Sequence, residues 1–231
     1  MKLERPVLYL TIEIALDTAL PTYSGGLGVL AGDHVRSAAD MGIDLTAVSL
    51  WYRKGYGIQH FDIERQQVMT FPSVSPERVL EDTGIELTLQ LGHEEVAAKV
   101  YRKVVGGIEG SVSVYFLDAG LPQNADHWRE CSEQLYGGDS AHRLRQEMLL
   151  GFGAMALAEA LDMHKGCRVH LNEGHCAMAA VSVLMAEGGP KEGLERTRER
   201  CRFTTHTPVA AGHDVFDYGM VEDVTGSEFC N

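Results

Sequence analysis

Residues 7–50, VLYLTIEIALDTALPTYSGGLGVLAGDHVRSAADMGIDLTAVSL, decide the fold class of this chain. The run Val7 to Ile14 is apolar and β-branched, which predicts a strand. A glycine-rich loop follows, and apolar residues then recur at helical spacing over Val29 to Met41. A second strand-like run covers Leu45 to Leu50. This order of strand, loop, helix and strand predicts a βαβ unit with parallel strands.

The rest of the sequence has the pattern of an α/β protein, except for one segment that is rich in strands. From about residue 56 to 118, short alternating segments are separated by glycines, which predicts an antiparallel β-rich insertion. Helical spacing returns over Ala141 to Leu161. Short strands are then expected at Arg168 to Leu171 and at Arg202 to Thr205, with helices between them. We therefore expect an α/β, Rossmann-like lobe with a β-rich insertion.

The composition limits the classes of partner. The chain has 231 residues and a formal net charge of −13, so it would repel a nucleic-acid backbone. Glu4 and Glu13 interrupt the N-terminal apolar run, which is unlike a signal peptide. The apolar run Met148 to Ala158 is shorter than the ~20 residues that span a bilayer. With five cysteines and no CxxC pair, we expect reduced thiols in a cytoplasmic protein that binds neither nucleic acid nor membrane.

The segment Tyr23 to Gly28, YSGGLG, is the first candidate for chemistry. It lies between a predicted strand and a predicted helix, where backbone N–H groups and the helix dipole favour an anion. Gly25, Gly26 and Gly28 are therefore candidate phosphate-binding residues. The alternative is a tight strand-to-helix turn whose backbone angles need glycine. No Gly-Lys-Ser/Thr follows, so the loop is not a Walker A motif.

The segment His170 to His175, HLNEGH, is the second candidate. Asn172, Glu173 and His175 follow a predicted strand, at the carboxyl end where open α/β sheets bind ligands. Together these side chains donate and accept hydrogen bonds, as sugar hydroxyls require. Asn172 or Glu173 could instead cap the next helix. The spacing matches neither H-E-x-x-H nor H-x-x-E-H, so we expect no metal.

The segment Phe203 to Pro208, FTTHTP, is the third candidate. It ends another predicted strand in a polar turn that presents His206 and Thr207. Taken alone, His206 is more often a hydrogen-bonded loop histidine than a catalytic one. Because all three polar turns follow strands, they should gather at one edge of the sheet, which favours a functional role. Arg53 and Lys54 could attract phosphate or be surface charges, and the sequence does not decide between the two.

Together these segments resemble the α-glucan (glycogen, starch, maltodextrin) phosphorylase family, in particular its short bacterial and archaeal members. The matching stretches, in the family's order, are ALPTYSGGLGVLAGDHVRSAADMG, YRKGYGIQ, LYGGD with RLRQEMLLGFGAMAL, HLNEGH and FTTHTPVAAGHD. They touch most of the chain, and coverage is weakest from Phe61 to Asp118. GGLG alone is common, whereas the long first stretch and THTP-x-x-AGHD are highly specific.

The resemblance implies a two-lobed glycosyltransferase-B fold in which residues 1–231 form the N-terminal lobe and the active site lies between the lobes. Members of the family cleave terminal α-1,4-glucosyl units of glucans or maltooligosaccharides with inorganic phosphate. The product is α-glucose 1-phosphate with retained configuration. Pyridoxal 5'-phosphate is the cofactor, and its phosphate exchanges a proton with the substrate phosphate. The residues that match are Gly25, Gly26 and Gly28 beside the phosphates, His206 as the catalytic residue of the glucosyl pocket, and Asn172, Glu173, His175 and Thr207 as sugar-binding neighbours.

One departure from the family pattern concerns the cofactor. The family anchors it through a lysine in a G-T-S-N-M-K-like segment of the C-terminal lobe, and none of this chain's six lysines lies in such a segment. We therefore expect that lobe to be absent here and to act as a partner, and this chain alone to be inactive. A further departure is Ala210, where proline is usual. The exposed docking face could drive self-association into a homo-oligomer.

Two other functions stay open at the level of sequence. One is a non-catalytic glucan-binding or regulatory module. The other is a lobe of a nucleotide-sugar glycosyltransferase, against which THTP-x-x-AGHD argues.

Overall fold

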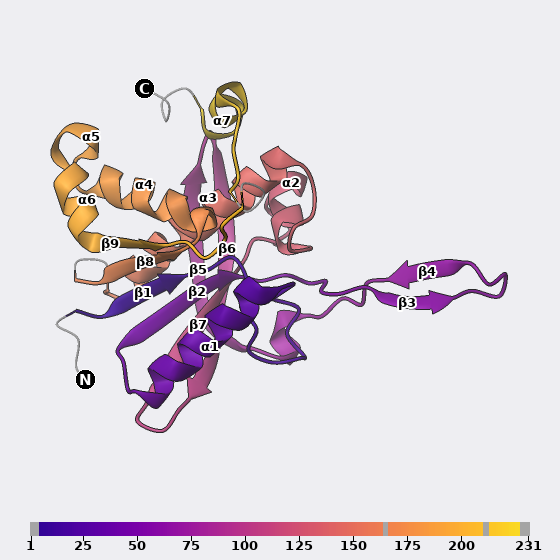
Figure 1. Cartoon of the computed structure of the whole chain (residues 1–231). Coiled ribbons are helices and arrows are strands. Elements are labelled where there is room, and N and C mark those ends of the chain that lie inside the picture. Colours follow the sequence, from indigo (N-terminus) through magenta and orange to yellow (C-terminus); the bar gives the residue numbers. More distant parts are fainter. Residues whose placement is uncertain (1–4, 164–165, 210–212, 227–231) are drawn as a thin grey trace.

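The computed structural model describes residues 5–163, 166–209 and 213–226. Ala210, the departure from the family pattern noted above, and Cys230, one of the five cysteines, lie outside these residues. Figure 1 shows a twisted sheet through the molecule, helices on both of its faces and a hairpin that projects to one side. The described part of the chain is therefore an α/β structure, consistent with a Rossmann-like fold.

In the described ranges the strands form a seven-stranded sheet, in the order β5-β6-β7-β2-β1-β8-β9, and a separate hairpin, β3-β4. The strands are β1 (Val7–Leu10), β2 (Leu45–Leu50), β3 (Ile58–Phe61), β4 (Gln67–Thr70), β5 (Glu81–Leu91), β6 (Glu94–Gly106), β7 (Ser111–Asp118), β8 (Arg168–Asn172) and β9 (Cys201–Thr204). The α-helices are α1 (Gly26–Asp40), α2 (Asp126–Arg129), α3 (Ser140–Ala160), α4 (Ala177–Ala186), α5 (Gly189–Glu192), α6 (Leu194–Arg200) and α7 (Tyr218–Thr225). The short 3₁₀ helices are η1 (Pro76–Arg78), η2 (Glu130–Ser132) and η3 (Gly174–Cys176).

The predicted βαβ unit is present as β1, α1 and β2. Strands β1 and β2 pair in parallel, with Val7 opposite Leu45. Strand β1 ends at Leu10 rather than Ile14, because the chain turns back and Ile14 N donates to Thr22 O at 2.8 Å. Helix α1 begins at Gly26, three residues before the predicted Val29, because the glycines that suggested a loop form its first turn. The predicted start of the helix was wrong, because glycine lowers helix propensity and the helical pattern therefore becomes readable only after the glycines.

The segment from residue 56 to 118 contains the antiparallel strands that its sequence predicts, but most of it does not form a separate unit. Strand β6 pairs antiparallel with β5 on one side and with β7 on the other, and β7 pairs in parallel with β2. They therefore extend the central sheet. Only the β3-β4 hairpin stands apart from it, as Figure 1 shows.

The sheet has a hydrophobic core on each face. Alternation along β1 sends Leu8 and Leu10 into one core with Leu144 and Met148 of α3. Tyr9 points the opposite way, into the core that contains α1 residues such as Val35. Helices α3 and α4 thus cover one face and α1 covers the other, which leaves the carboxyl ends of the parallel strands open for a site.

Two global expectations can be compared with the structure. Among the described residues, no helix combines the length and apolarity needed to cross a bilayer. The four cysteines that the structure describes, Cys131, Cys167, Cys176 and Cys201, carry no disulfide.

Candidate functional site

The three predicted turns meet at the carboxyl edge of β1, β8 and β9. Asn172, the last residue of β8, donates from Nδ2 to Thr11 Oγ1 at 3.2 Å. From the segment after β9, Thr207 N donates to the Glu173 carboxylate at 3.0 Å. Leu27 of the glycine-rich segment, His175 and Thr207 line a single pocket of about 560 Å³. The convergence that the strand order predicts is therefore present in the structure.

The glycine-rich segment is organised by a residue that the sequence interpretation did not select, Glu13. Its Oε2 accepts hydrogen bonds from Ser24 N at 2.7 Å and Gly25 N at 3.1 Å. Gly25 and Gly26 have open space where a side chain would begin. Gly28 is buried, and a Cβ there would lie 2.8 Å from Glu13 Oε2. Gly28 thus allows close approach of α1, whereas Gly25 and Gly26 border open space.

Glu173 fastens the turn after β9 to the turn after β8. Its side chain is 1% exposed and accepts hydrogen bonds from Thr205 Oγ1 at 3.1 Å, from His206 N, and from Thr207 N and Oγ1 at 3.0 and 3.2 Å. Burial raises the pKa of Glu173, but these hydrogen bonds outweigh it and lower the pKa below its usual value. Because its oxygens are occupied by the protein, Glu173 shapes the site rather than presenting a carboxylate to a ligand.

His206 is held beside Asn172. Its Nε2 lies 3.0 Å from Asn172 Oδ1, and the residue is exposed at the end of β9. An amide oxygen accepts a hydrogen bond, so Nε2 carries the proton in this pairing and Nδ1 is the free acceptor. The contact orients the ring, and His206 does not itself line the 560 Å³ pocket, although its neighbour Thr207 does.

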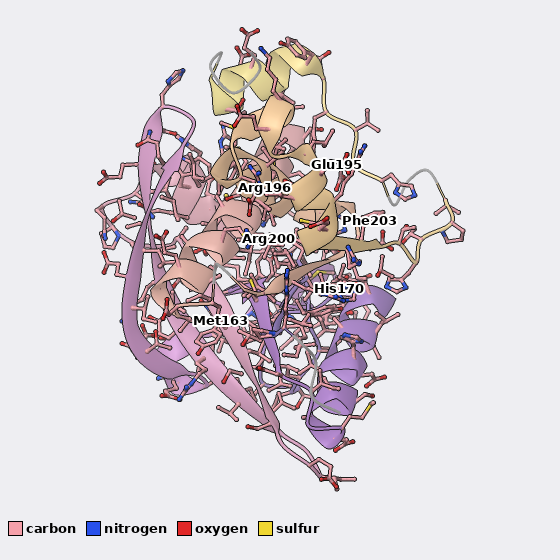
Figure 2. The ribbon with its side chains drawn as sticks, turned by 90° about the vertical axis from the view of Figure 1, so that its left-hand side faces the viewer. Met163, His170, Glu195, Arg196, Arg200 and Phe203 are labelled. Atoms are coloured by element: carbon pink, nitrogen blue, oxygen red, sulfur yellow. The ribbon has the colours of Figure 1, made fainter. Side chains whose placement is uncertain are left out.

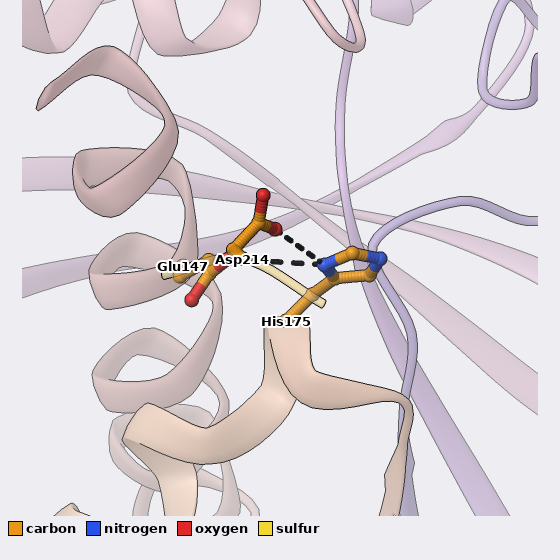
Figure 3. A group of neighbouring side chains, drawn as sticks. All are labelled: Glu147, His175 and Asp214. Atoms are coloured by element: carbon orange, nitrogen blue, oxygen red, sulfur yellow. Dashed lines mark hydrogen bonds and ion pairs between the residues drawn. The ribbon is translucent and has the colours of Figure 1, made fainter. Parts of the chain in front are cut away.

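A charged cluster forms the floor of the pocket, as Figure 3 shows for three of its members. Asp214 Oδ2 lies 3.1 Å from His175 Nδ1 and accepts from Nε and Nη2 of Arg143, both at 3.1 Å. Glu147, 3% exposed, lies behind them with Oε1 3.7 Å from His175 Nδ1. Burial raises the pKa of Glu147. Burial also acts to raise the pKa of Asp214, but a hydrogen bond from Glu147 and the Arg143 charge lower it overall. The arrangement holds His175 with Nδ1 toward the carboxylates and leaves Nε2 for a ligand.

The same cluster has the spacing of a metal site but not its charge balance. Ligand atoms of Glu147, His175 and Asp214 all lie within 4.8 Å of one another. However, Arg143 Nη2 lies 3.2 Å from His175 Nδ1 and 3.1 Å from Asp214 Oδ2. A guanidinium thus already supplies the positive charge that the carboxylates need, which disfavours a second cation there.

Arg53 and Lys54, which could have attracted phosphate, are both paired with carboxylates. Arg53 makes a two-pronged contact with Asp118, Nη1 to Oδ1 at 3.1 Å and Nη2 to Oδ2 at 2.8 Å. Lys54 Nζ lies 2.8 Å from Glu133. Both side chains hold the loop after β2 rather than lining the pocket.

The residues present fit the phosphorylase cofactor only in part. The start of α1 has open space at Gly25 and Gly26 and a positive dipole end, which suits a phosphate. The pocket lining, taken over the described residues, includes Arg143 but no lysine that could hold an aldehyde covalently. Covalent attachment of pyridoxal phosphate therefore does not fit this part of the chain.

Five residues that shape the site were missed by the sequence interpretation: Glu13, Tyr136, Arg143, Glu147 and Asp214. Three of them carried a readable signal. Glu13 is a charge within an apolar strand-like run, and Arg143 and Glu147 are one helical turn apart on the face of α3 that also carries buried leucines. Their partners could not be read from the sequence, because Asp214 is 71 positions away from Arg143.

Comparison with known proteins gives relatives along nearly the whole chain. No family model matches it. The chain is 40% identical over 230 residues to the maltodextrin phosphorylase of Thermococcus litoralis, covering 96% of the chain and 27% of that protein. It is 36% identical to the glycogen phosphorylase of Mycobacterium tuberculosis (94% of the chain, 26% of that protein) and 31% identical to that of Aquifex aeolicus (95% and 33%). The chain thus spans about a quarter to a third of the length of these relatives. By sequence, the chain matches an N-terminal fragment of the maltodextrin/glycogen phosphorylase family.

Proposed function

We propose that this chain supplies the glucosyl-binding wall of an α-glucan phosphorylase. The reaction would transfer a terminal α-1,4-linked glucosyl unit to inorganic phosphate and release α-glucose 1-phosphate with retained configuration. The observation that carries the proposal is the 560 Å³ pocket, in which His175 and Thr207 share a wall with Leu27 at the start of α1. Names of the relatives support the same class of activity.

The side chains have separate roles in this proposal. His175 Nε2 and Thr207 Oγ1 are placed to hydrogen-bond glucosyl hydroxyls. His206, next to Thr207 in the chain, is the proposed catalytic residue, and Asn172 orients it. Gly25, Gly26 and Gly28 form the start of α1, against which a phosphate would lie. Glu173 has a positioning role, since its carboxylate joins the two turns that carry His175 and His206.

The charges of the pocket explain why we propose that catalysis needs a second part. Among the lining residues that the structure describes, Asp139 and Asp214 oppose one arginine, Arg143. Such a surface suits neutral hydroxyl groups better than a phosphate dianion. Further cations and the cofactor would come from a C-terminal lobe in a glycosyltransferase-B arrangement. We propose a cytoplasmic setting for the assembly, because its substrates are intracellular in the family that the chain resembles.

A non-catalytic glucan-binding module is the second candidate, favoured by the same excess of acidic over basic lining residues. The two proposals separate in one experiment. The chain is co-expressed with the remaining part of the Thermococcus litoralis relative, and release of glucose 1-phosphate from maltooligosaccharide is measured with and without phosphate. Phosphate-dependent release by the pair, and by neither part alone, supports the phosphorylase. A stable, cofactor-loaded pair without release supports the binding module.

A further inference from the structure

Glu13 is a buried carboxylate at the junction of three segments. It is 2% exposed and follows β1, where the chain leaves the sheet. Its Oε2 accepts from Ser24 N and Gly25 N, at the entry to α1. Its Oε1 accepts from Tyr136 Oη at 2.7 Å. One carboxylate therefore ties the glycine-rich segment to the turn that precedes α3.

These contacts lie at the pocket. Leu27, directly after Gly26, and Tyr136 both line it. Glu13 does not line the pocket itself but links the two segments that carry these residues. Tyr136 is also covered by Arg143, whose guanidinium carbon lies 4.5 Å from the ring centre. The carboxylate thus fixes the position of the tyrosine on which the pocket's arginine rests.

The Glu13 contacts also have an electrostatic consequence. Backbone N–H groups at the start of a helix bind anions, and here the two amides directly before the first helical residue, those of Ser24 and Gly25, already hold a carboxylate. A phosphate near the same amides would meet a fixed negative charge a few ångströms away, in surroundings where such repulsion is weakly screened. A neutral hydroxyl would meet no such repulsion.

We propose that Glu13 is the residue that sets ligand specificity at the glycine-rich segment. Its carboxylate occupies the Ser24 and Gly25 amides. Its negative charge repels a phosphate there but not a neutral sugar hydroxyl, so phosphate binding is confined to the first turn of α1. The inference rests on the proposed function in one respect, that phosphate and sugar share this pocket.

The test replaces Glu13 by glutamine, which has the same shape and keeps an oxygen for the two amides. Affinities of the wild-type chain and of Glu13→Gln are measured by NMR titration with inorganic phosphate and, separately, with maltotetraose. We expect the phosphate affinity of Glu13→Gln to rise about tenfold, the effect of removing one nearby charge. Affinity for the neutral maltotetraose should change less than about twofold. A purely structural role for Glu13 would shift both affinities together.

Glu64→Gln is the matched control, because it removes the same charge from the loop between β3 and β4, away from the site. If phosphate binds Glu13→Gln no more tightly than wild type, or if both ligands change in parallel, the proposal is wrong. Should Glu13→Gln not fold, the phosphate affinity of Glu13→Ala is measured with and without acetate, since acetate should refill the site and compete with phosphate. A phosphate affinity that acetate does not lower would overturn the proposal. Phosphate binding gained only by the variant supports the proposal even if wild type binds no maltotetraose, a result that would count against the proposed function alone.

Discussion

At the residue scale, Glu173 shows how a residue that resembles a ligand-binding carboxylate can serve the architecture. It adopts a backbone conformation with positive φ, φ +72° and ψ 172°, between β8 and η3. That conformation is uncommon for a residue with a side chain. The hydrogen bonds from residues 205–207 to its carboxylate compensate for it. The sequence identified Glu173 as part of the site, but its contacts with the neighbouring turn appear only in the structure.

Glu173→Gln should weaken the folded state by about 2–3 kcal/mol, because a neutral amide cannot accept the full set of bonds from a buried position. The measurement is urea unfolding at pH 7. Glu195→Gln is the control, since Glu195 is 80% exposed and its surface pair with Arg198 contributes little. Equal stability of Glu173→Gln and wild type would show that the carboxylate does not hold the two turns together.

Glu173 should also make the unfolding free energy depend on pH. The folded-state pKa of Glu173 is lowered, so the folded state binds its proton less readily than the unfolded chain does. Its contribution to stability is therefore fully present above the unfolded pKa of about 4.3 and is lost as the pH falls through the folded pKa. The difference in unfolding free energy between wild type and Glu173→Gln should shrink from pH 7 to pH 3. A difference that stays constant over this range would contradict the assignment.

His34 and His170 should cause a second loss of stability, at a higher pH than the loss caused by Glu173. His170, labelled in Figure 2, lies with its ring centre 5.6 Å from that of His34, and both rings contact Tyr9. Burial and the charge of neighbouring histidines lower the pKa of both. The unfolded chain therefore binds protons first, and this stability is present above pH ~6.5 and lost below it. The double variant His34→Gln/His170→Gln should lose less unfolding free energy than wild type between pH 7.5 and 5.5. An identical loss would assign the effect to other groups.

At the scale of elements, the crossing of α3 and α4 depends on Gly151. A Cβ added there would lie 2.5 Å from Ala179 N and from Met178 C, which are backbone atoms that cannot move independently. Gly151→Ala should therefore lower the unfolding free energy by about 1–3 kcal/mol, despite the ~1 kcal/mol that alanine gains as a helix former. Gly153→Ala, on the same helix, is the comparison, because its nearest contact is the movable side-chain carbon Leu117 Cδ1 at 2.6 Å. Thermal unfolding of both variants decides the matter, and a smaller loss for Gly151→Ala than for Gly153→Ala would contradict this packing.

The elements also show what a sequence can predict. Periodicity found β2, α3, β8 and β9 within a residue or two, because each is bounded by glycine or polar residues and packs one apolar face. It predicted antiparallel strands within residues 56–118 but not the membership of β5, β6 and β7 in the central sheet. That membership depends on the pairing of β7 with β2, a long-range contact that alternation cannot specify.

At the scale of the whole molecule, the candidate site is assembled from segments spread over about two hundred residues, from Glu13 to Asp214. Each predicted turn follows a strand, so topology alone brings the turns to one edge of the sheet. Side-chain hydrogen bonds and ion pairs then complete the site, and they link residues as distant as Glu13 and Tyr136 or Arg143 and Asp214. The motifs predicted that these turns come together, whereas the charged cluster beside them depends on contacts that no local pattern carries.

The central claim is that the pocket between α1, α3 and the turns after β8 and β9 holds a glucosyl unit. Its most direct test is an NMR titration of this chain with maltotetraose, with backbone and histidine resonances assigned. We expect the largest shifts at His175, Thr207 and Leu27, and at least a tenfold loss of affinity in His175→Ala. Shifts confined to other surfaces, or unchanged affinity in His175→Ala, would contradict the claim.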